Sequence, residues 1–165
     1  MHTPEQEKGD KFEIWLALLL IYHGYKDVKW DFRVHKGRPY RQLDIAYNFD
    51  SNGKPSVIVE AKYTADGEIK YKLRTPKKKK EGDRIIRIDN LVDEVLERQG
   101  FVGAKKSCLV TNRFFDGELR RESKKAGIYV VEHPTLTRMY RSLGGRSAIE
   151  DSINAIDISK YSNRC

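Results

Sequence analysis

Two carboxylates and an amine in the first half of the sequence have the residue types and the spacing for chemistry on a phosphate. Asp44 lies in the alternating stretch 43–49, and Glu60-Ala61-Lys62 follows the apolar run 57–59. Successive side chains of a β-strand point to opposite faces, so Glu60 and Lys62 are predicted to point the same way. A strand at this position would present a carboxylate and an ammonium group side by side.

The segment between these stretches decides whether Asp44 joins them. Residues 50–55, Asp-Ser-Asn-Gly-Lys-Pro, are rich in turn formers and predict a β-hairpin. A two-residue turn at Asn52-Gly53 would place Asp44 opposite Ala61, on the wrong face. A three-residue loop at 51–53, with Gly53 in the left-handed conformation, would pair Asp44 with Glu60 instead. The chemistry requires this second register.

Facing carboxylates on neighbouring strands, roughly 5 Å apart, repel each other unless a cation lies between them. We expect Mg²⁺, with Mn²⁺ able to substitute, held by Asp44, Glu60 and the backbone carbonyl of Ala61. The ion would lower the pKa of bound water and neutralise charge on the attacked phosphate. Lys62 would orient the nucleophile or stabilise the developing negative charge. The expected reaction is hydrolysis of a phosphodiester bond.

Apolar spacing predicts the elements that must position this hairpin. A helix is expected over 4–22, and Gly24 follows it as a stop signal. The other predicted elements are a strand at 28–34, an extended or hairpin excursion with a mobile basic loop at 63–82, a helix from Asp89 to Gly100, a strand at 107–111, a polar helix at 116–126, a strand at 128–131 and short helices at 135–143 and 147–156. The unit at 107–131 should have parallel edge strands. This order predicts an α/β fold, with a mixed central sheet flanked by helices.

Length and composition favour one compact domain that binds a polyanion. The 165 residues carry a net charge of +8, which attracts nucleic acid more plausibly than a membrane. The apolar run 14–22 is too short to span a bilayer, and no signal peptide is indicated, so we expect a soluble, cytoplasmic protein with no membrane partner. The two cysteines, Cys108 and Cys165, exclude a Cys-rich zinc site. We expect a core at 1–133 with a basic insertion at about 64–84, and a helical extension of the same domain at 134–165.

The order of acids and lysine also resembles a known family. Asp44, followed across a hairpin by Glu60-Ala61-Lys62, resembles the PD-(D/E)XK motif of restriction-endonuclease-like nucleases, although Leu43 stands where the pattern has proline. Residues 9–13, Gly-Asp-Lys-Phe-Glu, are similar to the first helix of Mrr-type restriction endonucleases. Residues 109–114, Leu-Val-Thr-Asn-Arg-Phe, resemble that family's later strand, helix, strand unit.

The resemblance implies a restriction-endonuclease-like fold and a Mg²⁺-dependent DNA endonuclease, restriction-like or homing-like. Asp44, Glu60 and Lys62 would be catalytic, and Glu13 would be an accessory acid that reaches the metal directly or through water. A homodimer is expected, because cutting both strands of a duplex needs two active sites. Three alternatives stay open: archaeal Holliday junction resolvases share these features, a non-catalytic DNA-binding module could use the same fold, and Glu13 could simply favour the helix dipole.

Basic residues near the motif are candidates for DNA contact. The run of four lysines could meet several phosphates and make binding strongly salt-dependent. Exposed lysine and arginine side chains also occur without any partner, so each is weak evidence alone. The DNA-binding candidates are Arg41, Lys54, Lys77, Lys78, Lys79, Lys80 and Arg113.

Overall fold

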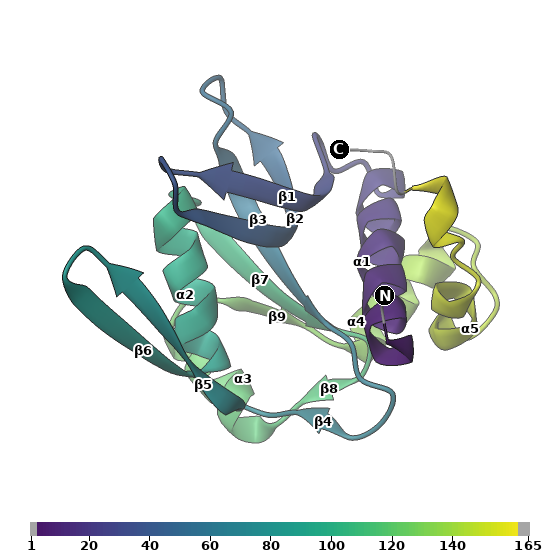
Figure 1. The fold of residues 1–165 in the computed structure, drawn as a ribbon. Helices are drawn as coiled ribbons and strands as arrows, with labels where there is room; N and C mark the ends of the chain where they lie inside the picture. Colours follow the sequence, from purple (N-terminus) through teal and green to yellow (C-terminus); the bar gives the residue numbers. More distant parts are fainter. Residues whose placement is uncertain (1–2, 162–165) are drawn as a thin grey trace.

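The computed structural model describes residues 3–161, which form an α/β fold around a mixed central sheet (Figure 1). The helices are α1 (Pro4–Tyr22), α2 (Leu91–Val102), α3 (Gly117–Lys125), α4 (His133–Ser142) and α5 (Ile149–Asn154), with a 3-10 helix η1 (Ile158–Lys160). The strands are β1 (Lys29–His35), β2 (Tyr40–Phe49), β3 (Pro55–Lys62), β4 (Glu68–Ile69), β5 (Lys72–Glu81), β6 (Arg84–Asn90), β7 (Lys106–Thr111), β8 (Phe114–Phe115) and β9 (Tyr129–Val131). The predicted fold class is confirmed.

The central sheet has the strand order β1-β2-β3-β7-β9. The first three strands are antiparallel, and β3, β7 and β9 run parallel to one another, as expected for the unit at 107–131. Helices α1, α4 and α5 share one core cluster with the sheet, whereas α2 and α3 pack in a cluster on its other face. Helices therefore flank both faces of the sheet, and β3 lies at its centre.

Helix α1 starts where its local sequence specifies. The side chain of Thr3 accepts a hydrogen bond from the Gln6 N–H, and the Gln6 side chain accepts one from the Thr3 N–H, while Pro4 occupies the first turn. Phe12 and Leu16 are buried almost completely, and burying such side chains stabilises the fold by about 1.5–3 kcal/mol each. This packing holds Glu13 close to the sheet. Within residues 3–161, no helix combines the length and the apolar character needed to cross a membrane.

The hairpin of β2 and β3 has the register that the chemistry requires. Ile45 pairs with Val59 and Tyr47 with Val57, which aligns Asp44 with Glu60. The Asp50 N–H donates to the Lys54 carbonyl at 2.9 Å, so three residues form the loop, and Gly53 has a φ of +78°. The predicted three-residue loop is confirmed. Left-handed backbone at its last position favours glycine.

The basic insertion differs from the sequence expectation. Lys77–Lys80 lie in β5, which pairs with β6 in a two-stranded sheet of its own, and not in a loop. The pairing residues of β6 supply the apolar anchor, because Ile88 is 2% exposed. Helix α2 is capped by Asn90, whose side chain accepts from the Asp93 N–H, and it ends at Gly103 with a φ of +71°. The predicted start at Asp89 and end at Gly100 were wrong, because β6 continues through Asn90 directly into the helix, and Gly103 has the left-handed conformation that ends it.

Candidate active site

Asp44 lies where β2 changes face. Leu43 packs in the cluster of Ile58 and Val102, whereas Ile45 packs in the cluster of α1. Residues two apart share a face in a regular strand, so the chain is irregular at Asp44. This irregularity separates Asp44 from the regular alternation of the strand and leaves its side chain half-buried between α1 and β3.

The adjacent strand β1 has a matching irregularity. Its pairing with β2 joins Trp30 to Ile45 and Phe32 to Leu43, which puts Asp31 opposite Asp44. Asp31 has a φ of 52°, a backbone conformation that costs energy for a residue with a side chain. Two acidic residues, Asp31 and Asp44, therefore occur at the point where the side chains of both strands change face.

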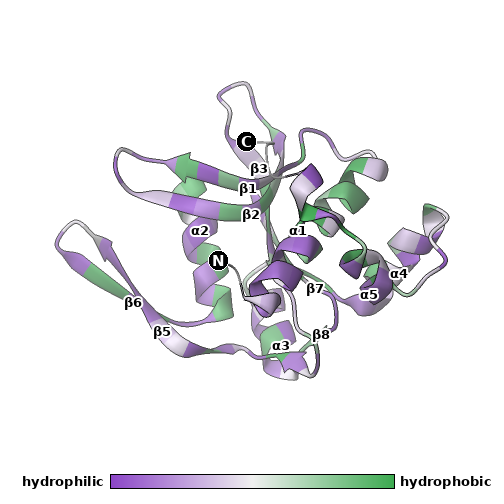
Figure 2. Cartoon of the chain, turned by 45° about the vertical axis from the view of Figure 1, so that its right-hand side comes forward, coloured by the Kyte–Doolittle hydropathy of each residue, from purple (hydrophilic) through white to green (hydrophobic). Residues whose placement is uncertain are grey.

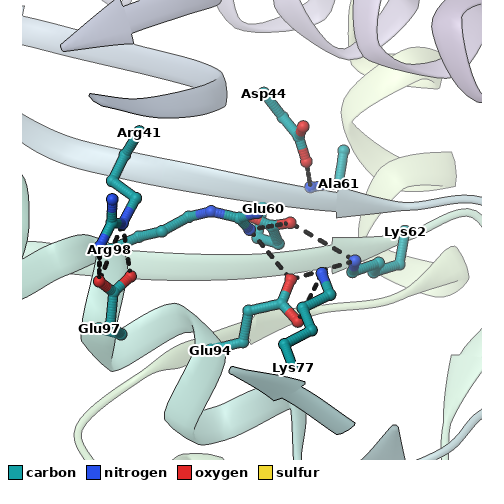
Figure 3. Close-up of polar contacts among 9 residues, drawn as sticks. All are labelled: Arg41, Asp44, Glu60, Ala61, Lys62, Lys77, Glu94, Glu97 and Arg98. Carbon is teal, nitrogen blue, oxygen red and sulfur yellow. Dashed lines mark hydrogen bonds and ion pairs between the residues drawn. The ribbon is translucent and has the colours of Figure 1, made fainter. Parts of the chain in front are cut away.

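The Asp44 carboxylate is held by the next strand. Its Oδ2 atom accepts a hydrogen bond from the Ala61 N–H at 2.8 Å (Figure 3). Glu13 of α1 approaches the same carboxylate: burial, the charge of Asp44 and a hydrogen bond to Asp44 raise the pKa of Glu13 to about 11. Asp10 and Asp31 raise that pKa further. Two carboxyl groups this close need a proton or a cation between them.

Glu60 is buried, 6% exposed, and points toward α2. Its Oε1 atom lies 2.6 Å from the Arg98 guanidinium and 3.5 Å from Lys62 Nζ. Burial raises the pKa of Glu60, and the charge of Asp44 adds to that effect, while Arg98 and Lys62 oppose it. Lys62 is half-buried, and this desolvation alone would lower its pKa, but the charges of Glu60 and Glu94 outweigh it, so the pKa is raised and Lys62 stays charged.

Glu94 completes a chain of alternating charges beneath β3. It is 2% exposed and its carboxylate lies 3.1 Å from Arg98, 3.9 Å from Lys62 Nζ and 3.1 Å from Lys77 Nζ of β5 (Figure 3). Although burial alone would raise the pKa of Glu94, these three cations lower it. We define the ion network as Glu60, Lys62, Lys77, Glu94 and Arg98.

The sequence analysis missed Glu94 and Arg98, although a signal for them exists. Glu94 is one residue before Val95 and three after Leu91, so a helical wheel places it on the buried face of α2. An acid within an apolar stripe needs a partner, and Arg98 is one turn further on.

Another functional residue that the sequence did not reveal, Asn112, fixes the chain as it leaves Lys62. Asn112, 1% exposed, donates its Nδ2–H to the Thr64 carbonyl at 2.8 Å and accepts from the Thr64 N–H at 2.9 Å. Tyr63 donates to Glu150 of α5. These bonds tie the C-terminal end of β3 to β7 and α5, which limits the positions that Lys62 can take.

The DNA-binding candidates are dispersed. Arg41 is 9% exposed and forms a bidentate pair with Glu97, so a phosphate could reach it only if this pair opened. Lys54 precedes β3 and Lys62 ends it, a separation of roughly 25 Å along an extended strand. Arg113 donates to the Gly67 carbonyl at 3.3 Å. Of these candidates, Lys77 joins the ion network, and Lys78–Lys80 continue along β5.

The donor set suits a hard divalent cation in its chemistry. Glu13, Asp44 and Glu60 offer oxygen ligands only, and the pKa values of Glu13 and Glu60 are raised by burial and further by the charge of Asp44. Within residues 3–161, however, no three His, Cys, Asp or Glu side chains are arranged to hold a metal ion. The Glu60 carboxylate is turned toward Arg98, so a three-carboxylate site would require Glu60 to exchange that partner for the ion.

Comparisons with known proteins support the fold and leave the function open. No protein-family model and no curated protein sequence matches the chain. A solved protein of unknown function, AF1548, is similar over 83% of this chain and 67% of its own, with 16% identity and a TM-score of 0.60. The DNA modification-dependent restriction endonuclease AspBHI aligns with 94% of this chain, which spans 41% of AspBHI, with 14% identity and a TM-score of 0.48.

Proposed function

We propose that this chain is a metal-dependent endonuclease that hydrolyses phosphodiester bonds of DNA. One observation carries the proposal: the carboxyl groups of Glu13 and Asp44 meet beside the strand that carries the Glu60–Lys62 pair. Two acids with raised pKa values, the half-buried Glu13 and the buried Glu60, beside a charged lysine suit a site that binds a cation and a phosphate. The net charge of +8 is in keeping with a nucleic-acid substrate.

Each residue has a distinct role in this proposal. Asp44, Glu13 and the backbone carbonyl of Ala61 would hold Mg²⁺ or Mn²⁺, joined by Glu60 once it exchanges Arg98 for the ion. The ion would supply positive charge beside the scissile phosphate and make the attacking water more acidic. Lys62 carries its charge at the end of β3, where it can hold the nucleophile or a non-bridging phosphate oxygen. The Ala61 N–H holds the Asp44 carboxylate in place.

A plasmid-cleavage assay tests the proposal. The wild type should nick supercoiled DNA in Mg²⁺ or Mn²⁺ and not in EDTA. Asp44→Asn and Lys62→Met should each lower the rate by about 10²-fold or more, the scale of losing a charge-stabilising group. Glu5→Gln, an exposed acid on the same helix as Glu13, and Lys70→Met, an exposed lysine, serve as matched controls and should cut at the wild-type rate.

Two results would reject the proposed site. One is metal-dependent nicking that persists unchanged in Asp44→Asn and Lys62→Met. The other is tight DNA binding by a protein that cuts no DNA substrate in any divalent metal. The second result would favour a non-catalytic DNA-binding module, in which the pair of Glu60 with Arg98 is permanent.

The form of the DNA substrate separates the two nuclease hypotheses. A restriction-like or homing-like enzyme should cut linear duplex, and a Holliday junction resolvase should prefer a four-way junction of matched sequence. If the protein acts as a homodimer with one site per subunit, linear product should appear without a long-lived nicked intermediate. Sedimentation of the protein with and without duplex measures the oligomeric state directly.

A further inference from the structure

The β5–β6 hairpin is a strongly basic ribbon that stands beside the candidate site. Residues 72–90 hold eight Lys or Arg against three Asp or Glu, a net charge of +5 out of +8 for the chain. Among the residues that the structure describes, the two strands pair only with each other, and they project from the base of α2 (Figure 1). β5 is hydrophilic along most of its length, whereas β6 carries apolar segments (Figure 2).

The two faces of this ribbon differ in their partners. On the inner face, Lys77 lies opposite Ile88 and Lys79 opposite Ile86. Ile88 is buried, Lys77 pairs with Glu94 at 3.1 Å, and burial together with Arg41 lowers the pKa of Lys79. The inner face is therefore packed on α2, and it fixes the orientation of the ribbon relative to the candidate site.

The outer face is exposed and its charges are poorly compensated. Lys78 lies opposite Arg87, and Lys80 lies opposite Ile85, which is 69% exposed. Like charges placed directly opposite each other destabilise a strand pair. Arg87 forms an exposed pair with Asp89 at 2.7 Å, and within the described residues Lys78 and Lys80 form no ion pair. An anionic partner would relieve this repulsion.

We propose that the outer face of the hairpin, defined as Lys78, Lys80 and Arg87, binds the phosphate backbone of duplex DNA. Its positive charge complements the phosphate backbone of the duplex, which carries one negative charge per about 1.7 Å of helix axis. Residues 72–90 contain no aromatic side chain, so the ribbon lacks the stacking platforms that single-strand binders use. The contacts are independent of base sequence, because they reach phosphates and not base edges.

This inference takes from the proposed function only that DNA is the substrate. Binding to DNA can be measured without cleavage. Fluorescence anisotropy of a labelled 20-base-pair duplex in EDTA reports affinity at several salt concentrations. Lys78→Gln/Lys80→Gln should lower the slope of log affinity against log salt by about 2 and weaken binding roughly 10- to 30-fold at physiological salt. Lys78→Arg/Lys80→Arg keeps both charges and should bind as the wild type does.

A matched pair of lysines controls for net charge. Lys105 and Lys106 are exposed at the start of β7, beside Val57 and so at the end of the sheet remote from Lys62. Lys105→Gln/Lys106→Gln removes the same charge and should change the slope by less than half as much. Circular dichroism confirms that both double variants are folded.

The inference fails if both glutamine double variants weaken duplex binding equally. It also fails if the hairpin variant weakens binding only to a single strand of the same length, or only to phosphatidylserine vesicles, with duplex binding unchanged. Loss of metal-dependent cleavage in Asp44→Asn with duplex affinity in EDTA retained would support the catalytic site independently. A wild type that binds duplex through the hairpin and never cuts it would reject the proposed function and leave this inference standing.

Discussion

Carboxylates lie on two sides of β3, in opposite electrostatic surroundings. Above the strand, Glu13 and Asp44 share a hydrogen bond, and the nearby charges that most affect Glu13 are acidic. Below it, Glu60 and Glu94 alternate with Arg98, Lys62 and Lys77 (Figure 3). Glu13 and Asp44 are half-buried and Glu60 and Glu94 are buried, yet only the second pair has its charge balanced by basic side chains.

Because of this difference, the acidic residues on the two sides of β3 should respond differently to a divalent ion. The Glu13–Asp44 pair must hold a proton or take up a cation, so a divalent ion should change it strongly. The ion network is already compensated, so an added ion gains little unless it displaces Arg98 from Glu60. Glu60 belongs to both groups, because Asp44 raises its pKa while Arg98 opposes that rise.

The largest effect is expected from removing the central cation of the network. Arg98→Met leaves Glu60 and Glu94 buried beside fewer cations, so the free energy of unfolding should fall by about 3–5 kcal/mol. Urea denaturation at pH 7 measures the loss. Lys125→Met removes one partner of the exposed pair with Glu122 and should cost less than about 0.5 kcal/mol. A loss below 1 kcal/mol for Arg98→Met would mean that the network does not stabilise the fold.

A somewhat smaller effect, with a defined pH dependence, is expected at Glu94. Three cations lower its pKa below the value of 4.5 for the unfolded chain, so its contribution is present above that pH and is lost as the pH falls. Glu94→Gln should cost about 2 kcal/mol at pH 7, because Arg98 and Lys62 retain Glu60 as a partner. The difference from the wild type should shrink toward pH 3 in thermal unfolding. A difference that is constant from pH 7 to pH 3 would contradict this assignment.

Local rules predicted the part of the site that local geometry controls. The register of Asp44 against Glu60 follows from a three-residue loop and the period of two, both of which depend on residues 43–62 alone. The change of face at Asp44 could not be predicted in this way. It arises from matched irregularities in β1 and β2, and from the packing of different helices on the two faces of the sheet.

The conformation of Lys77–Lys80 also could not be predicted from the local sequence. Four consecutive lysines have low strand propensity and no apolar alternation, so residues 77–80 alone indicate a loop. Their strand conformation depends on β6, where Ile86 and Ile88 alternate toward α2. The pairing partner supplies the apolar face that β5 lacks.

On the other side of β3, metal-free protein should become less stable as the pH rises, because Glu13 binds a proton in the folded state that it releases on unfolding. Its folded pKa, about 11, is above the unfolded value of 4.5, so the loss is at most about 1.4 kcal/mol per pH unit in between. Glu13→Gln lacks this proton linkage, so in EDTA its stability relative to the wild type should increase steadily from pH 5 to pH 9. Thermal unfolding between pH 5 and pH 9 measures the gap.

Magnesium should make the wild type more stable than Glu13→Gln. A ligand that binds only the folded state stabilises it by an amount that grows with its concentration, so Mg²⁺ should raise the melting temperature of the wild type. Asp44→Asn should lose this response, and Glu5→Gln should retain it. Equal shifts in the wild type and Asp44→Asn would show that the ion binds elsewhere.

The smallest effect on stability is expected at the hairpin, and it sharpens the contrast with the ion network. Lys78 and Lys80 are exposed and form no ion pair with any side chain that the structure describes, so their charges oppose folding weakly. Lys78→Gln/Lys80→Gln should change the free energy of unfolding by less than about 0.5 kcal/mol. We expect a small increase, because the substitution removes the repulsion between Lys78 and Arg87. Urea denaturation in EDTA provides the measurement. A loss above 1 kcal/mol would show that these lysines hold the ribbon together, and their effect on DNA affinity would then have a structural cause.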